Sequence, residues 1–444
     1  MKTIANETIA AIATPQGQGG IGIVRISGPE TIKIAESMVG KVPRARCATY
    51  TKFLANNGDV LDEGVTLYFK APYSFTGEDV LELHGHGGPV VMDMLLRRVV
   101  ECGARLARPG EFSERAFLNN KLDLSEAEAI ADLINAHSEQ AARSAIRSLQ
   151  GEFSKQINEL VQKLIHLRMF VETSLDFPEE EINFLSDKRV SCDLQQIIDQ
   201  LNQVLQSANQ GRLLQEGMTV VIAGKPNAGK SSLLNLLSGQ ESAIVTDIPG
   251  TTRDILREYV QLDGLPLHII DTAGLRETAD IIEQEGVKRA KAAMEEADRI
   301  LLMIDCQDKE TVSPLQKKNT TIIYNKIDLI NRESSIEKQG DHIIIYLSVR
   351  TGKGIELLKQ HLKECMGFDS TVEGKFIARR RHLNALEKAK ECLLRGQKQL
   401  KDKLAGELLA EDLLQAQNAL SEITGEFRSD DLLGKIFSEF CIGK

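Results

Sequence analysis

A glycine-rich segment at residues 224–232 constrains the fold more than any other part of the chain. It reads Gly-Lys-Pro-Asn-Ala-Gly-Lys-Ser-Ser and fits the pattern G-x-x-x-x-G-K-[ST], whose backbone amides surround nucleotide phosphates. The apolar run 218–223 predicts a strand before it, and 232–237 predicts the start of a helix. A strand tip followed by a helix N-terminus favours an anion, so we expect a nucleotide site here rather than a chance glycine turn.

Further polar segments follow expected strands in the order found in GTP-binding domains. A threonine of segment 246–252 is expected to complete Mg²⁺ coordination and to sense the γ-phosphate. Asp271, at a strand tip, suits Mg²⁺ held through water, and the Gly274 amide can face the γ-phosphate. The Asp328 carboxylate can accept hydrogen bonds from guanine N1–H and the exocyclic amine, a donor pair that adenine lacks. Segment 348–350 would close over the base, so we predict a Ras-like GTP-binding domain.

The phosphate loop and the later segments together supply the expected GTP contacts. Lys230 is expected to reach the β- and γ-phosphates, and the Ser231 hydroxyl to bind Mg²⁺. The residues expected to contact GTP are Asn227, Ala228, Gly229, Lys230, Ser231, Ser232, Thr246, Asp247, Ile248, Pro249, Gly250, Thr251, Thr252, Asp271, Thr272, Ala273, Gly274, Asn325, Lys326, Ile327, Asp328, Ser348, Val349 and Arg350.

The residue after this Asp-Thr-Ala-Gly segment departs from Ras. Leu275 stands where Ras-type GTPases carry a glutamine that orients the attacking water, and an apolar side chain cannot do this. Hydrolysis therefore needs another group, and Glu283 is the candidate among Glu277, Glu283 and Glu285. The alternative is that these acids only begin the helix expected over 287–294.

The composition fits a soluble globular protein of two to three domains. The chain has 444 residues, 42% hydrophobic and 27% charged, and a net charge of −10, which does not suggest a globally basic surface for nucleic acid. Its seven cysteines are scattered without a CxxC pair, which is typical of reduced thiols and a cytoplasmic protein. No apolar run approaches membrane-spanning length and no signal peptide is recognisable, so no membrane association is expected.

The N-terminal region predicts a mixed α/β domain. Expected strands cover 8–14, 21–27, 65–69 and 80–83, and expected helices cover 29–39 and 90–100. Gly17, Gly19 and Gly22 match the dinucleotide pattern G-x-G-x-x-G, but an extended apolar segment follows them instead of a helix. We reject that match.

The same region contains two histidines, His84 and His86, at alternate positions. Alternate side chains of a strand point to one face, which suits a shared metal ion. No third ligand is evident in the sequence, and the glycines around the histidines indicate a tight turn before the helix at residue 90. Metal binding is therefore the lesser alternative.

From residue 124 the pattern changes to long amphipathic helices. Ser125 with the acidic residues after it predicts a helix start. Apolar residues repeat at helical spacing within 157–165, 194–205, 383–394 and 408–423. Between these blocks the expected strands are 219–223, 257–262, 266–271, 300–305, 320–325 and 342–347, alternating with helices as in a mostly parallel sheet. The predicted fold class is α/β plus α, with a helical bundle interrupted by an inserted nucleotide domain.

Several segments outside the GTPase motifs are also distinctive. They are Ala-Thr-Pro at 13–15, Gly-Gly-Ile-Gly-Ile-Val-Arg-Ile-Ser-Gly at 19–28, Tyr-Ser-Phe-Thr-Gly-Glu-Asp at 73–79, His-Gly-His-Gly-Gly-Pro at 84–89, Arg-Pro-Gly-Glu-Phe-Ser at 108–113, Asn-Lys-Leu-Asp-Leu at 120–124 and the terminal Phe-Cys-Ile-Gly-Lys. Through these segments and the GTPase motifs, the chain resembles the MnmE (TrmE) family of tRNA uridine-5-carboxymethylaminomethyl modification GTPases.

The resemblance implies a domain order and a function. The implied parts are an N-terminal folate-binding and dimerisation domain (1–120), a helical domain in two parts (121–213 and 373–444) and a G domain (214–372). With an FAD-dependent partner, MnmG, the family adds an aminomethyl-type group to C5 of the wobble uridine of certain tRNAs, with a tetrahydrofolate derivative as one-carbon source. The residues matching the 5-formyltetrahydrofolate contacts are Arg25, Glu82, Lys121 and Lys444.

The resemblance also implies that K⁺-dependent dimerisation of the G domain activates hydrolysis, with the K⁺ charge in place of an arginine finger. The matching K⁺ ligands are Asn227, Thr246, Ile248 and Thr251, and the Mg²⁺ ligands are Ser231 and Thr252. Glu283 matches the glutamate that positions water, and Pro249 should stiffen its loop. Cys441 is either a nucleophilic or redox group near the folate or a small apolar residue at a helix end.

Two other functions compete with this one. An RNA-binding ribosome-assembly GTPase would be expected to end in a basic KH-like domain with a GXXG loop, whereas this chain ends in amphipathic helices and Cys-Ile-Gly-Lys. A folate-binding scaffold, in which the G domain only regulates assembly, remains the third possibility.

Overall fold

The chain divides into two compact units, each discontinuous in sequence. The first comprises Met1–Ala131, Leu149–Leu194 and Glu391–Lys444, and the second Asp132–Ser148 and Gln195–Lys390. The computed structural model describes residues 7–15, 17–136, 138–176, 188–240, 257–262, 265–271, 297–308, 319–340, 342–365, 376–403, 406–426, 436–437, 440 and 443.

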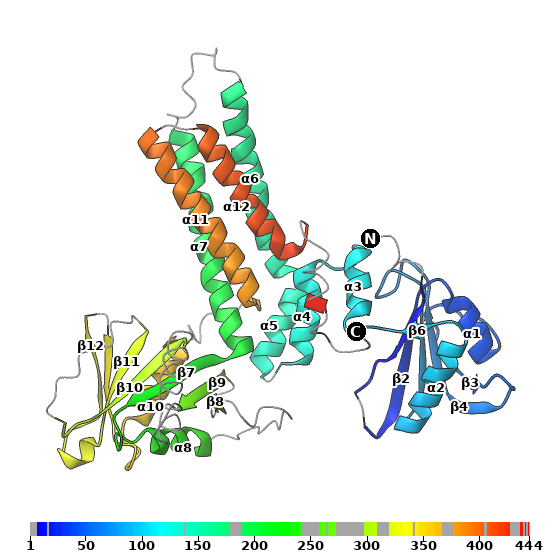
Figure 1. Cartoon of the computed structure of the whole chain (residues 1–444), viewed down its shortest axis with the longest axis horizontal. Coiled ribbons are helices and arrows are strands. Elements are labelled where there is room, and N and C mark those ends of the chain that lie inside the picture. The colour runs from blue at the N-terminus through cyan, green and yellow to red at the C-terminus, as the bar shows by residue number, and fades with distance from the viewer. Residues whose placement is uncertain are drawn as a thin grey trace, which may run out of the picture. The chain divides into compact units, whose positions relative to one another are not determined.

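A six-stranded sheet with the order β3-β4-β5-β2-β1-β6 forms the N-terminal part of the first unit. Its strands are β1 (Ile9–Ile12), β2 (Gly19–Ser27), β3 (Thr49–Leu54), β4 (Val60–Phe69), β5 (Val80–Gly87) and β6 (Arg105–Leu106). Helices α1 (Thr31–Val39) and α2 (Pro89–Glu101) pack their apolar residues on one face, against Val24, Ile26, Leu81 and Leu83 (Figure 1). The segment after the glycine-rich loop is a strand, so rejecting the dinucleotide fingerprint was correct.

Strand β5 corrects one expectation. The glycines around His84 and His86 do not form a turn, because the strand continues to Gly87. Gly19 pairs with Gly87 across β2 and β5, and a Cβ at Gly87 would lie 2.7 Å from the carbonyl oxygen of Gly19. These glycines permit two strands to approach closely. Strand β3 was not anticipated, since its residues do not stand out as an apolar run.

The residue that caps helix α4 (Leu124–Ile134) is Asp123, two residues before the expected Ser125. The Asp123 carboxylate accepts a hydrogen bond from the backbone N–H of Glu126 at 2.9 Å, and the Glu126 carboxylate accepts one from the N–H of Asp123, also at 2.9 Å. This reciprocal pair is a capping box with aspartate in the first position. Ser125 therefore lies inside the first turn, where its hydroxyl donates to Asp123.

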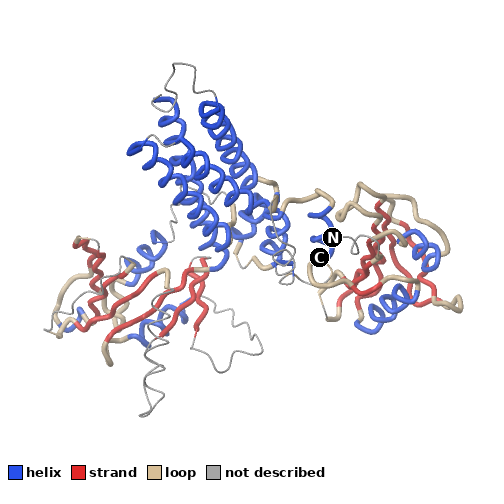
Figure 2. Tube along the Cα trace, turned by 45° about the horizontal axis from the view of Figure 1, so that its top comes forward, coloured by secondary structure: helices blue, strands red, loops and turns tan. Residues whose placement is uncertain are grey.

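Six further helices, four of them long, belong to the α part of the fold as described. They are α3 (Glu111–Leu118), α5 (Glu139–Leu149), α6 (Glu152–Asp176), α7 (Lys188–Glu216), α11 (Arg380–Lys403) and α12 (Gly406–Thr424). Helices α6 and α12 pack along each other (Figures 1 and 2), and Arg168 donates to Gln417 between them at 2.8 Å. Segments before and after the inserted domain thus form one helical part, as expected. No helix among the described residues is long and apolar enough to span a bilayer.

The second unit contains a seven-stranded sheet with the order β12-β13-β11-β10-β7-β9-β8. Its strands are β7 (Met218–Gly224), β8 (Arg257–Leu262), β9 (Leu265–Asp271), β10 (Arg299–Asp305), β11 (Thr320–Asn325), β12 (Ser335–Gln339) and β13 (His342–Tyr346). The five central strands run parallel and the two edge strands antiparallel. Leucines of α8 (Lys230–Gln240) and α10 (Ile355–Cys365) share one core over this sheet. The predicted mostly parallel sheet is confirmed.

One residue joins helix α7 to strand β7. Gly217 has φ of 78°, and a Cβ there would lie 2.7 Å from the His268 ring. The Asp298 carboxylate binds both sides of this joint: it accepts from the Arg212 guanidinium at 2.6 Å and from the Thr219 backbone N–H at 2.9 Å. Helix α7 is therefore fixed directly to the strand that leads into the phosphate loop.

A buried ion-pair network holds helix α3 against the N-terminal sheet. The Glu111 carboxylate, with no exposed surface, accepts two hydrogen bonds from Arg105, at 2.5 and 2.8 Å. Arg115, which is 3% exposed, donates to Glu111 and to Glu78. Burial favours the protonated acid, but the Arg105 guanidinium and the Arg108 amide outweigh it and lower the pKa of Glu111 to about 2.

We predict that Glu111→Gln destabilises the protein at pH 7 by about 3 kcal/mol or more, because Arg105 and the buried Arg115 lose the carboxylate that they share in the interior. The wild-type contribution should be complete above the ordinary glutamate pKa of 4.5 and should fall as the pH drops toward about 2, so the variant should show a flatter acid profile. Glu101→Gln, at an exposed ion pair with Arg98, is the matched control, and calorimetry at pH 3–7 is the measurement. Equal stability of the two variants at pH 7 would contradict the prediction.

Candidate functional site

The phosphate loop owes its shape to three residues with positive φ. Strand β7 ends at Gly224 (φ 150°), helix α8 begins at Lys230, and Asn227 (φ 64°) and Gly229 (φ 100°) lie between them. A Cβ at Gly229 would lie 2.3 Å from the Asn325 amide nitrogen, so only glycine fits. The loop thus turns sharply from strand tip to helix N-terminus, as the sequence predicted.

Lys230 closes the loop on itself. Its side chain is buried, and its ammonium group donates to the backbone carbonyls of Gly224 at 3.0 Å and Lys225 at 2.9 Å. Both acceptors belong to the loop. The cation is therefore held where the loop backbone curves around it, in reach of an anion that binds the loop.

The Asn325 carboxamide connects three separate loops. Its amide nitrogen donates to the carbonyl of Ala228 at 2.8 Å, in the phosphate loop. Its oxygen accepts from the backbone N–H of Lys326 at 2.8 Å and from that of Val349 at 3.0 Å. Asn325 is only 3% exposed, so these bonds form away from water, where unpaired groups are costly. The phosphate loop, segment 325–328 and segment 348–350 are fixed to one another by this side chain.

Two acidic residues complete the edge of the sheet. The Lys326 ammonium contacts Asp305 at 2.6 Å, and Asp305 pairs in register with Asn325 across β10 and β11. Burial raises the pKa of Asp305, but the hydrogen bond from Lys326 and that from the Gln307 amide lower it overall. The Ser348 hydroxyl donates to the Asp328 carboxylate at 2.6 Å and so orients it.

The structure brings together the described part of the predicted nucleotide site. Register places Gly224 opposite Met303, and Asp271 opposite Ile222, so the strand tips share one edge. Ser231 is exposed in the first turn of α8. The predicted residues outside the described part are Thr246, Asp247, Ile248, Pro249, Gly250, Thr251, Thr252, Thr272, Ala273, Gly274, Glu283, Cys441 and Lys444, and of Asp271 only the backbone is described.

Arg25 and Glu82, predicted as folate contacts, meet in the N-terminal sheet. They are paired in register on β2 and β5, and the Arg25 Nε donates to Glu82 at 2.9 Å. The pair lies on the face opposite α1 and α2. Arg25 also lies over the Phe75 ring at 5.8 Å and the Phe112 ring at 5.9 Å. The guanidinium is thus held by one carboxylate and two aromatic faces.

The C-terminal segment contributes to the same place. Arg25 Nη1 donates to the backbone carbonyl of Gly443 at 3.2 Å. Gly443 has φ of 95°, and a Cβ there would lie 2.5 Å from the carbonyl oxygen of Ile12. Lys121, the third predicted contact, donates instead to the carbonyl of Pro72 at 3.1 Å. Sequence reasoning missed Gly443, because no local pattern signals a contact across 418 residues.

The histidines of β5 pair with carboxylates rather than with each other. His84 contacts Glu82 at 3.0 Å, and His86 contacts Asp62 at 2.7 Å. In the described part of the chain, no three His, Cys, Asp or Glu side chains gather as a metal site requires. The metal alternative finds no support here.

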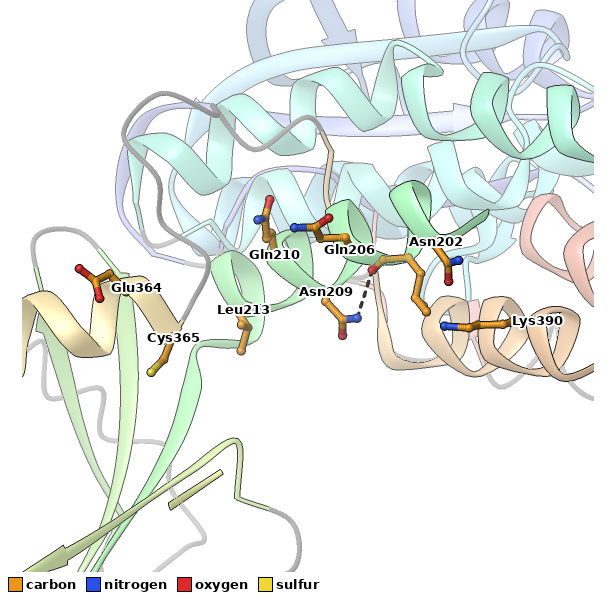
Figure 3. A pocket seen from close by; sticks show the side chains of 9 residues that line it. Asn202, Gln206, Asn209, Gln210, Leu213, Glu364, Cys365 and Lys390 are labelled. Carbon is orange, nitrogen blue, oxygen red and sulfur yellow. Dashed lines mark hydrogen bonds between the residues drawn. The ribbon is translucent and has the colours of Figure 1, made fainter. Parts of the chain in front are cut away.

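A groove of about 390 Å³ in the second unit contains none of the predicted site residues (Figure 3). Carboxamides of α7 line it, with the last residues of α10 and a lysine of α11. The lining residues are Asn202, Leu205, Gln206, Asn209, Gln210, Leu213, Glu364, Cys365 and Lys390. Asn209 already donates to the Leu205 carbonyl at 3.1 Å. We assign no ligand to this groove.

We predict that Asn325→Ala lowers guanine nucleotide affinity by about tenfold or more, because three buried hydrogen bonds of roughly 1 kcal/mol each are lost from the site. Titration with a fluorescent GDP analogue measures the effect. Asn319→Ala is the matched control: Asn319 precedes the same strand and donates to Ala297 at 2.7 Å, away from the site. Comparable losses in both variants, or none in Asn325→Ala, would show that Asn325 does not organise the site.

Comparison with known proteins places the chain in a family. The family described as MnmE helical domain matches residues 124–441, and that described as GTP-binding protein TrmE N-terminus matches residues 8–121. The tRNA modification GTPase MnmE of Hydrogenovibrio crunogenus (strain DSM 25203 / XCL-2) is 61% identical, over 99% of both chains. That of Coxiella burnetii (strain Dugway 5J108-111) is 60% identical over 100% of both.

Among solved structures, the G domain of the T. maritima FeoB iron transporter is 26% identical, over 33% of this chain and 98% of that one, with a TM-score of 0.26. That structural likeness is too slight to carry an argument. The identity to the relatives spans the complete chain and exceeds by far what a shared fold alone requires. The chain belongs to the MnmE family of tRNA modification GTPases.

Proposed function

We propose that this protein is the GTP-hydrolysing component of a complex that adds a carboxymethylaminomethyl or aminomethyl group to C5 of the wobble uridine of certain tRNAs. Family membership supports the tRNA assignment, since the relatives are named tRNA modification GTPases. The observation that carries the nucleotide assignment is the Asn325 carboxamide, which fixes the phosphate loop to the two segments expected around the base.

Each described segment has a role in this proposal. The Asp328 carboxylate, oriented by Ser348, accepts the guanine N1–H and amine hydrogens. The loop amides and the α8 N-terminus hold the phosphates, and Lys230 exchanges its carbonyl partners for phosphate oxygens. Mg²⁺, held by Ser231 and Thr252, would neutralise charge on the phosphates. The exposure of the Ser231 side chain at the start of α8 fits a metal ligand.

The proposed hydrolysis step requires two G domains. K⁺ held by Asn227, Thr246, Ile248 and Thr251 would supply the charge that an arginine finger supplies elsewhere. Asn227 is exposed in the loop, and its positive φ keeps it out of the regular turn of α8. Glu283 would then position the attacking water, since Leu275 cannot.

The proposed one-carbon donor is a tetrahydrofolate derivative bound by the N-terminal domain. The Arg25–Glu82 pair offers a donor and an acceptor side by side, which suits the carbonyl and N–H edge of a pterin. Lys121 and Lys444 would bind carboxylates, and Cys441 lies two residues before Gly443, whose carbonyl reaches Arg25. A homodimer, the FAD-dependent partner MnmG and a cytoplasmic location complete the proposal.

Nucleoside mass spectrometry of tRNA tests the function. A strain without this protein should lack the C5-modified wobble uridine, and the wild-type gene should restore it. Lys230→Ala should fail to restore it, because the phosphates lose their cation. Lys225→Ala, in the same loop but ion-paired to Asp308 at 3.7 Å, should succeed. Unchanged tRNA in the deletion strain would refute the proposal.

The ion dependence of hydrolysis tests activation. We predict GTP hydrolysis at least about tenfold faster in KCl than in NaCl at equal ionic strength, because the cation stands in for an arginine finger. Asn227→Gly should abolish the difference, since glycine accepts the positive φ while removing the carboxamide. Asn235→Gln, exposed on α8, should retain it. Equal wild-type rates in both salts would remove the K⁺ assignment.

A further inference from the structure

Two exposed cationic side chains, those of Arg46 and Lys121, donate hydrogen bonds to neighbouring residues of the segment that connects β4 and β5. Arg46 Nη2 donates to the backbone carbonyl of Tyr73 at 3.2 Å, and its guanidinium lies 5.6 Å from the centre of the Tyr73 ring. Lys121 Nζ donates to the carbonyl of the preceding residue, Pro72, at 3.1 Å. Because consecutive Cα atoms are at most about 3.8 Å apart, both positive charges lie over one short stretch of backbone.

The backbone presents Arg46 in an unusual conformation. Its φ of 58° lies in the left-handed region, which non-glycine residues rarely adopt and which costs on the order of 1 kcal/mol. The Arg46 N–H donates to Tyr68 at 2.7 Å, and Ala45 forms a bridge to the same residue. These bonds hold the backbone in place and direct the guanidinium toward Tyr73.

The same connection links these cations to the Arg25–Glu82 pair. Phe75, two residues after Tyr73, lies against the Arg25 guanidinium. Exposure increases along this path: the side chains of Arg25 and Glu82 are 19% and 13% exposed, whereas Tyr73 is 69% exposed. A ligand with its head at the inner pair would therefore extend its far end toward water past Lys121 and Arg46.

The acidic residue of the same connection, Asp79, binds partners other than Arg46 and Lys121. Asp79 accepts hydrogen bonds from the Tyr68 hydroxyl at 3.0 Å and from the Ala71 N–H at 2.9 Å. Its carboxylate is thus bound at the base of the connection. It faces Tyr68 rather than Arg46, and burial together with this hydrogen bond raises the pKa of Tyr68 to about 12.

We propose that Lys121 and Arg46 form a subsite for the polyglutamate tail of a folate. This inference rests on the proposed folate function. Each γ-linked glutamate added to a folate brings one more carboxylate, which two cations in sequence can bind. A planar guanidinium that lies over an aromatic ring can bind a carboxylate through two parallel hydrogen bonds, so Arg46 would bind one tail carboxylate in this way and Lys121 would bind a neighbouring one as a point charge.

Calorimetry on the full-length protein with the mono- and triglutamate forms of 5-formyltetrahydrofolate tests the subsite. The triglutamate should bind the wild type roughly three- to fivefold more tightly, as expected for an exposed ion pair, and this preference should fade at 0.5 M KCl. Arg46→Gln should erase the preference and leave monoglutamate affinity and thermal stability unchanged. Arg44→Gln, which removes another exposed charge two residues earlier, should keep it.

The possible outcomes separate this inference from the folate assignment itself. Arg25→Ala should weaken both ligands by the same factor, because it acts on the common head group. Equal wild-type affinity for the two ligands, or equal effects of Arg46→Gln and Arg44→Gln, would overturn the subsite while leaving folate binding in place. Absence of binding of either ligand to the wild type would overturn both.

Discussion

The nucleotide site depends on one buried carboxamide. Asn325 donates to the phosphate loop and accepts from two other loops, so three segments far apart in sequence share its two polar atoms. The net gain is only about 1 kcal/mol per hydrogen bond, but leaving any of these groups unpaired in the interior would cost more. The glycine at 229 is required for the same reason, since any side chain there would displace the amide. The same side chain thus fixes the position of the phosphate loop and the arrangement of the loops at the edge of the sheet.

In the N-terminal domain, ion pairs fix helix α3 and the β4–β5 connection. Glu111 and Arg115, both buried, connect helix α3 to Glu78 near the end of the β4–β5 connection. That connection carries Phe75 against Arg25. Replacing Glu111 or Arg115 would therefore loosen helix α3 and also the segment that holds Phe75 against Arg25 in the proposed folate site. The nucleotide site combines the neutral hydrogen bonds of Asn325 with the charged contacts of Lys230 and Lys326 and with left-handed residues.

The sequence predicts the fold better than it predicts the contacts. The central strands of the second sheet are largely buried apolar runs, so their predicted bounds agree with the structure within one or two residues. Strand β3 escaped prediction because exposed and half-buried residues alternate along most of it. The sequence predicted Ser125 as the helix cap because a serine followed by acidic residues is a common capping pattern. In the structure, Asp123 and Glu126 form the cap instead. Contacts such as Arg25 with Gly443 join distant segments, and no local spacing encodes them.

The single-residue joint at Gly217 has a mechanical consequence. Helix α7 has 29 residues and is therefore about 44 Å long. Asp298 ties both sides of the joint, so no flexible linker remains to absorb rotation of strand β7. A tilt of about 5° at the strand would move the far end of a rigid helix of this length by about 4 Å. Helix α7 is thus a lever that pivots at Gly217, seven residues before the phosphate loop.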